Sequence, residues 1–190
     1  MPILLIIGSI IFLTADQVEY NLKQPQKINS SMVQHEELIH DHDKEEIDHK
    51  NPEAQKRMGI YHYNEGNKFL KQNKPEEAIR NYKMALHHNK FFEEAYINLS
   101  TAYLRKKNFI LSAKTLDTLK SINPKHPLLH YNYACYYSLL GNIPEGIKSL
   151  SLAIFYGFKN YQNLEIDSDI DNLRKSPQFQ KLRSLLLTKN

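Results

Sequence analysis

Residues 59–92 read GIYHYNEGNKFLKQNKPEEAIRNYKMALHHNKFF, and the two stretches that follow share their length and pattern. These are 93–126, EEAYINLSTAYLRKKNFILSAKTLDTLKSINPKH, and 127–160, PLLHYNYACYYSLLGNIPEGIKSLSLAIFYGFKN. Each contains 34 residues, and the three align without a gap. A "place" is a residue's position counted from the start of its own stretch. Self-similarity at a period of this length is typical of a repeat architecture.

Two places hold small residues in all three stretches. The eighth holds Gly66, Ser100 and Ala134, and the twentieth holds Ala78, Ser112 and Gly146. The eleventh and twenty-fourth places are bulky, with Phe69, Tyr103, Tyr137, Tyr82, Leu116 and Leu150. Small side chains let paired helices approach closely, and bulky ones fill the space on either side. With helix breakers at 73–75, 107–108 and 141–144, the pattern predicts three helical hairpins.

This pattern resembles the tetratricopeptide repeat family over residues 59–160. The resemblance implies an all-α, right-handed solenoid of helical hairpins whose first helices line a concave groove. Residues 161–190 do not continue the period and are similar to the segment that closes some of these arrays. Its apolar residues recur at helical spacings: Leu173, Phe179, Leu182 and Leu186. We therefore expect a capping helix over the open side of the third hairpin.

The repeat domain is predicted to span 51–190, because Asn51 followed by Pro52 is a typical helix start. The preceding arm, 16–50, carries nine acidic and four basic side chains, whereas 51–190 carries twelve and twenty-one. An acidic arm thus precedes a basic body. Low hydrophobicity and excess charge predict that the arm is disordered or partly helical.

The arm contains a histidine-rich stretch, HEELIHDHDKEEIDHK, at 35–50. His35, His42 and His49 recur every seven residues, and on a helix His42, Glu46 and His49 would share one face. Imidazole with carboxylate suits zinc, nickel or copper. A site on a polar segment must overcome the entropy lost on ordering it. A solvated tether is therefore the main interpretation, and metal binding or buffering is the alternative.

The N-terminal residues 1–15 are predicted to be a signal peptide. The apolar run 3–13 has the length of a signal-peptide core, and Thr14-Ala15 offers a cleavage point, although no Lys or Arg precedes the run. It is shorter than the roughly 20 residues that span a bilayer. We expect an exported, periplasmic or secreted protein of the bacterial envelope without a membrane span in the mature chain. An uncleaved anchor is the alternative.

No catalytic constellation is visible: there is no phosphate-binding loop, nucleophile elbow or paired-cysteine motif. We therefore predict a non-enzymatic protein that needs no cofactor. The basic residues are dispersed and match no nucleic-acid reader, so no nucleic acid is expected as partner. Cys135 is the only cysteine and cannot form an intrachain disulfide. The predicted partner is a protein or peptide, and the oligomeric state is left open.

Two places of the repeat form columns along the predicted groove. The fifth holds Tyr63, Ile97 and Tyr131, and the sixth holds Asn64, Asn98 and Asn132. An amide side chain both donates and accepts, so a column of Asn could pair with the backbone of an extended peptide, or could serve internal contacts instead. Lys71 and Arg105 add positive charge for an acidic ligand. The predicted binding residues are Tyr63, Asn64, Asn67, Lys71, Ile97, Asn98, Thr101, Arg105, Tyr131, Asn132 and Cys135.

One specialised ligand of the family is not expected. Some members grip the C-terminal carboxylate of heat-shock chaperones with two Asn and a set of Lys or Arg. Asn67 and Asn98 match the two Asn places. The places where those members carry Lys or Arg hold Tyr63, Leu128 and Asn132 in this sequence, so the resemblance does not extend to that clamp.

Overall fold

The structure is a computed structural model that describes the backbone of residues 51–187 and the side chains of 51–184. The predicted signal peptide (1–15) and acidic arm (16–50) lie outside the described residues. So do the four candidate metal ligands, His35, His42, Glu46 and His49. Those predictions therefore stay predictions.

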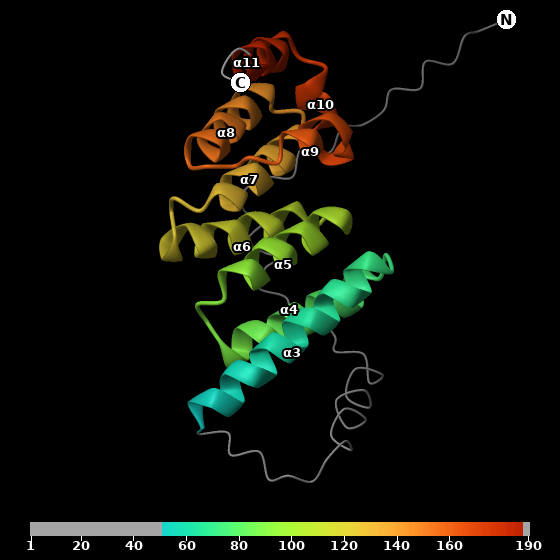
Figure 1. The fold of residues 1–190 in the computed structure, drawn as a ribbon. Coiled ribbons are helices and arrows are strands. Elements are labelled where there is room, and N and C mark those ends of the chain that lie inside the picture. The colour runs from blue at the N-terminus through green and yellow to red at the C-terminus, as the bar shows by residue number, and fades with distance from the viewer. Residues whose placement is uncertain (1–50, 188–190) are drawn as a thin grey trace, which may run out of the picture. The chain divides into compact units, whose positions relative to one another are not determined.

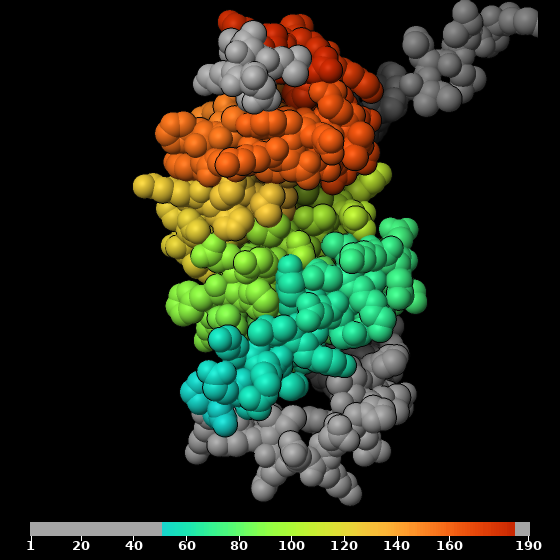
Figure 2. Space-filling model, in the orientation of Figure 1, coloured from blue at the N-terminus to red at the C-terminus, as the bar shows by residue number. Residues whose placement is uncertain are grey.

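The described residues form three helical hairpins followed by a closing segment (Figure 1). The hairpins are α3 (Pro52–Lys71) with α4 (Pro75–His88), α5 (Glu93–Arg105) with α6 (Phe109–Ile122), and α7 (Pro127–Leu139) with α8 (Ile143–Phe155). The closing segment comprises α9 (Tyr161–Ile166), the 3₁₀ helix η1 (Ser168–Ile170), α10 (Asp171–Arg174) and α11 (Pro177–Leu187). Figure 2 shows the same elements as successive bands in chain order. No strand occurs between residues 51 and 187, and the predicted all-α hairpin array is confirmed.

The first helix begins and the hairpins turn where the sequence predicted. Asn51 caps α3, because its side chain accepts the backbone N–H of Glu53 at 2.9 Å, and Pro52 follows at the first helical position. Each hairpin turn has its fifteenth place in the left-handed region, with φ of 56° at Asn73, 55° at Lys107 and 72° at Gly141. Only glycine adopts this conformation without steric cost. The turn geometry therefore repeats although the residue changes.

Glycines at the small-residue places allow close packing. A Cβ on Gly66 would lie 2.5 Å from Cε1 of the buried Tyr82 ring, so α3 and α4 could not pack as they do with a larger residue there. A Cβ on Gly146 would lie 2.5 Å from Cδ2 of Leu173. Gly146 therefore makes room for α10 of the closing segment, whereas the repeat pattern predicted room for the paired helix.

The closing segment, residues 161–187, covers the third hairpin as predicted. Leu173 and Phe179 are buried, with 0% and 2% of their surface exposed, and Leu182 packs against the same cluster. This cluster also contains Leu150 of α8, and so it joins the last hairpin to the cap. The exposed apolar side of the last repeat is thereby removed from water.

At the other end of the described array, α3 carries polar residues at places where α5 carries apolar ones. Places three, six, seven and ten of α5 hold Ala95, Asn98, Leu99 and Ala102, of which Leu99 and Ala102 are buried against the first hairpin. The same places of α3 hold Tyr61, Asn64, Glu65 and Lys68. Glu65 and Lys68 form an ion pair at 3.5 Å. This contrast marks α3 as the outer helix of the described array.

The helices between residues 51 and 187 are all too short or too polar to cross a bilayer.

Candidate functional site

A hollow of about 300 Å³ lies between the first helices of the first two repeats. It forms where α3 and α5 pack side by side: α3 contributes its ninth, twelfth and thirteenth places, and α5 contributes its sixth and thirteenth. We call it the first-junction hollow. Its lining residues are Asn67, Leu70, Lys71, Asn98 and Arg105.

A hydrogen-bond network fixes the two amides of the hollow. The Asn67 Oδ1 atom accepts the Tyr82 hydroxyl at 2.8 Å and the Asn98 Nδ2 group at 2.7 Å. Asn98 Nδ2 also lies 3.3 Å from the Tyr63 hydroxyl. Burial, with the neighbouring Tyr63, raises the pKa of Tyr82, so its hydroxyl stays a donor. The amides are therefore held in place before any ligand arrives.

The two cations of the hollow sit in the last turns of their helices. Arg105 donates from a guanidinium nitrogen to the Leu70 carbonyl at 2.7 Å, near the C-terminus of α3, and this carbonyl also accepts the Asn73 backbone N–H at 3.2 Å. Lys71 is exposed and forms no ion pair with the other described residues. Cations are favourable at helix C-termini because of the helix dipole. Their placement therefore does not require a carboxylate partner within the protein.

The structure brings together only part of the predicted groove. Asn67, Lys71, Asn98 and Arg105 line the first-junction hollow. Tyr63 is half-buried beside it and packs on Phe92 with ring centroids 4.8 Å apart. Asn64 is exposed on α3 at helical spacing from Asn67. Thr101 is half-buried and donates to the Ile97 carbonyl at 3.2 Å.

Four predicted binding residues lie in the interior instead, so their side chains offer little surface to a ligand. Ile97, Tyr131, Asn132 and Cys135 are all buried. The Asn132 side chain is not free to pair with a peptide backbone, because its Nδ2 group donates within the protein. Its acceptors are the Ile97 carbonyl at 3.0 Å, Ser100 Oγ at 2.8 Å and Thr101 Oγ1 at 3.1 Å. At this place the internal-contact alternative holds.

Tyr131 and Cys135 are buried because the cap covers them. The Tyr131 ring stacks on Phe158 at 4.5 Å, and its hydroxyl donates to Asp167 Oδ2 at 2.6 Å. Burial, and then the carboxylates of Asp167 and Asp169, raise the pKa of the Cys135 thiol well above its usual value. A thiol held in its protonated form is a poor nucleophile.

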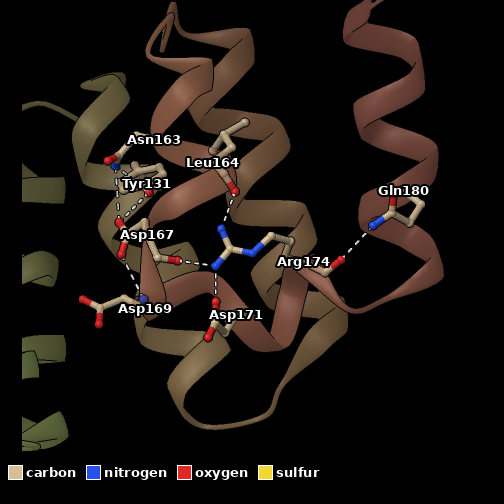
Figure 3. Close-up of polar contacts among 8 residues, drawn as sticks. All are labelled: Tyr131, Asn163, Leu164, Asp167, Asp169, Asp171, Arg174 and Gln180. Atoms are coloured by element: carbon tan, nitrogen blue, oxygen red, sulfur yellow. Dashed lines mark hydrogen bonds and ion pairs between the residues drawn. The ribbon is translucent and has the colours of Figure 1, made fainter.

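Arg174 ties the cap together (Figure 3). It donates to the carbonyls of Leu164 at 2.9 Å and Asp167 at 2.7 Å, and it pairs with the carboxylate of Asp171. Asp167 also accepts the backbone N–H of Asp169 at 2.9 Å, as expected for a turn and helix-cap residue. The hydrogen bonds of Arg174 and of the Tyr82 hydroxyl were not predictable from sequence, because neither residue stands out as a polar partner until its neighbours in space are known.

The two buried histidines of the repeats, His62 and His130, pack against other rings. His62 is buried and stacks on His88 with ring centroids 5.5 Å apart, and His130 stacks on Tyr156 at 5.0 Å. The His130 ring also donates to the Pro124 carbonyl at 2.8 Å. Within the part of the chain that the structure describes, no three His, Cys, Asp or Glu side chains gather as a metal site.

Comparison with solved structures decides the fold. The first TPR domain of Spaghetti (RPAP3), bound to the HSP90 peptide SRMEEVD, matches with a TM-score of 0.53 and 20% identity, covering 67% of this chain and 95% of that one. The fold is that of a tetratricopeptide repeat domain. The second TPR domain of human RPAP3, in complex with the HSP70 peptide SGPTIEEVD, matches this repeat domain with a TM-score of 0.53 and 17% identity, covering 66% and 100% of the chains.

Sequence comparison adds a local match. A chloroplastic protein of Arabidopsis thaliana is 36% identical over 52 residues, which is 27% of this chain and 16% of that protein. The match therefore spans about a sixth of the length of that relative. No protein-family model matches the sequence.

Proposed function

We propose that this protein is a non-enzymatic interaction scaffold that holds a segment of a partner protein against α3 and α5. The observation that carries the proposal is the first-junction hollow, where four polar side chains from two repeats converge. Preordered groups of this kind reduce the entropy lost when a ligand binds. The absence of a paired acid and base in the hollow favours binding over catalysis.

The proposed binding surface is narrower than the groove predicted from sequence. It comprises the first-junction hollow with Tyr63 and Asn64 beside it. These residues keep exposed or half-exposed side chains, whereas Asn132 and Tyr131 use their polar groups within the protein. The partner segment would therefore contact the first two repeats and end before the cap.

The solved neighbours support a peptide ligand by analogy. Both peptides in the matched structures, SRMEEVD and SGPTIEEVD, carry paired acidic residues. Those ligands belong to those proteins. In this chain Asn132 is buried and fully engaged, so it offers no group to a terminal carboxylate. We therefore propose a peptide partner without assigning the heat-shock chaperones.

Site-specific photocrosslinking tests the scaffold role. A photoreactive amino acid replaces Asn64, which is exposed on α3 about two helical turns before Lys71 of the hollow, and in a second protein it replaces the exposed Met84 of α4. We expect position 64 to yield adducts with one segment of one partner in the native cell, and position 84 to yield none of them. Equal adducts from both positions, or none from position 64, would contradict the proposal.

Location and metal binding rest on the sequence alone. We propose export to the bacterial envelope from the apolar run at 3–13, and the N-terminal sequence of the mature chain tests it. The alternative function, metal buffering by His35, His42, Glu46 and His49, is tested by titrating zinc, nickel and copper into the full chain. The full chain with His35, His42 and His49 changed to Gln is the control.

A further inference from the structure

The first-junction hollow carries two positive charges and no carboxylate. Lys71 and Arg105 occupy the thirteenth place of successive repeats, and both are exposed. A guanidinium has five N–H donors, and the bond to the Leu70 carbonyl uses one of them, leaving the others for a ligand. Lys71 has no anionic partner among the described residues. No residue that lines the hollow therefore neutralises its two positive charges.

The amides of the hollow add a neutral donor beside these cations. Because Asn67 Oδ1 accepts both the Tyr82 hydroxyl and Asn98 Nδ2, its own Nδ2 group must point elsewhere. That group makes no hydrogen bond to another described residue. Charged and neutral donors that converge on one space suit an anion with several acceptor sites, such as a carboxylate.

A negative group of the cap acts on Arg105 of the hollow through its charge. Burial and the charge of Asp167 raise the pKa of Asp169, and the positive charge of Arg105 opposes that rise. Asp169 and Arg105 therefore interact electrostatically, although they belong to η1 and α5. Ionised Asp169 would repel an acidic ligand from the cap side and so direct its carboxylates towards Lys71 and Arg105.

We propose that the first-junction hollow binds two side-chain carboxylates, spaced Glu-x-Glu or with Asp in either position, from an extended acidic segment of the partner. The proposal rests on the proposed scaffold function. Packed helices lie roughly 8–10 Å apart, which separates the two cations by a similar order of length. In an extended peptide, residues two apart point the same way and are about 6.5–7 Å apart. One carboxylate can then meet each cation.

Capped peptides supply the probe. The first contains Glu-Ala-Glu between Gly and Ser residues, the second contains Gln-Ala-Gln, and both are acetylated and amidated. A third is the Gln peptide with a free C-terminal carboxylate. Each is titrated into the full chain at low and moderate salt while backbone amide NMR shifts are followed, which gives both the affinity and the place of binding.

Matched charge variants locate the effect. Lys71→Gln with Arg105→Gln removes two positive charges from the hollow. Lys83→Gln with Lys114→Gln removes two from exposed positions on α4 and α6. We expect the first pair to weaken binding of the Glu peptide by about tenfold or more and the second to leave it unchanged, since a tenfold loss corresponds to one charge-assisted contact. Asp169→Asn should tighten binding several-fold.

Several results would overturn the proposal. These are equal binding of the Glu and Gln peptides, equal losses in both double variants, binding of the free-terminus peptide alone, or no binding of any peptide. The scaffold role is tested separately. If the crosslinks at position 64 persist unchanged in the Lys71→Gln/Arg105→Gln protein, the scaffold stands and the carboxylate preference is wrong. If position 64 yields no crosslinks at all, both proposals fall.

Discussion

The junction of the first two repeats and the junction of the third repeat with its cap place equivalent residues in opposite environments. Tyr63 and Tyr131 occupy the same place, and each packs on a phenylalanine, with ring centroids 4.8 Å and 4.5 Å apart. Tyr63 remains half-exposed beside the hollow, whereas only 5% of the Tyr131 surface is exposed. The repeat determines where a side chain sits, and the next segment determines whether it can meet a ligand.

The residues at the ninth place of the repeat show the same difference in exposure. Asn67 lines the hollow, while Cys135 is buried below the Asp-rich turn of the cap. The cap takes the position that a further first helix would occupy, since Asn163 and Asp167 bond the Tyr131 hydroxyl at 2.9 Å and 2.6 Å. One end of the array thus leaves its polar groups at the surface, and the other uses them for closure.

The largest effect is expected from a substitution at the junction of the third repeat with its cap. Leu173→Ala should lower the free energy of unfolding by about 2–5 kcal/mol, because the side chain is fully buried and leaves a cavity beside Gly146. The matched control is Leu70, which is half-buried at the junction of the first two repeats. Leu70→Ala should lower the free energy of unfolding by less than about 1.5 kcal/mol. Urea denaturation measures both.

Hydrogen exchange then shows where the damage lies. In a repeat array each unit contacts mainly its neighbours. Leu173→Ala should therefore speed amide exchange in α7, α8 and the cap more than in α3 and α4. Uniform acceleration over residues 51–187 would show that the two junctions are not independent, and the comparison would fail.

The second prediction concerns the two tyrosines. Burial, followed by the effects of Cys135 and Asp167, raises the pKa of Tyr131, so its hydroxyl remains a donor to the Asp167 carboxylate. Tyr131→Phe removes a bond to a charged acceptor and should cost about 1.5–3 kcal/mol. Tyr63→Phe removes only a 3.3 Å contact at a half-exposed site and should cost about 0.5 kcal/mol or less.

Thermal melting of the two proteins under one buffer is sufficient for this test. The two substitutions delete the same atom at the same place of the repeat, so differences in helix propensity cancel. Losses of equal size would mean that the hydroxyl environments are equivalent and that the cap does not lock Tyr131.

The hairpins were predictable from sequence because their determinants are local. Gly66 and Ala78 mark the close contact of α3 with α4, and the turn residues at 73–75 mark where the chain reverses. Asn51 and Pro52 marked the first helical residue for the same reason, since capping depends on neighbours in the chain. Such signals need no knowledge of the tertiary structure.

The site was only partly predictable because exposure is not local. Asn98 and Asn132 share the sixth place, yet Asn98 meets Asn67, whereas Asn132 meets Ser100 and Thr101. The partner one repeat earlier decides whether the amide stays near the surface. Likewise, nothing around Tyr131 in the sequence shows that a turn 36 residues later accepts its hydroxyl.

The smallest expected effect comes from Asp169, in η1 of the closing segment. Burial and the neighbouring Asp167 raise its pKa in the folded state. A raised folded-state pKa means that the folded protein binds this proton more tightly than the unfolded chain does. Ionised Asp169 therefore destabilises the fold at neutral pH, and protonation removes that cost as the pH falls through the folded-state pKa.

Asp169→Asn should accordingly stabilise the protein at pH 7, by roughly 0.5 kcal/mol or less because solvent screens a half-buried group. The difference from wild type should shrink on acidification and vanish below about pH 4, where the carboxyl is protonated in both folded and unfolded chains. Glu94→Gln is the control, since Glu94 is exposed on α5 and contacts no described partner. Melting temperatures of the three proteins from pH 7 to pH 4 measure the effect. A stabilisation that grows towards low pH would show that ionised Asp169 does not destabilise the fold, which is the opposite sign to the one expected here.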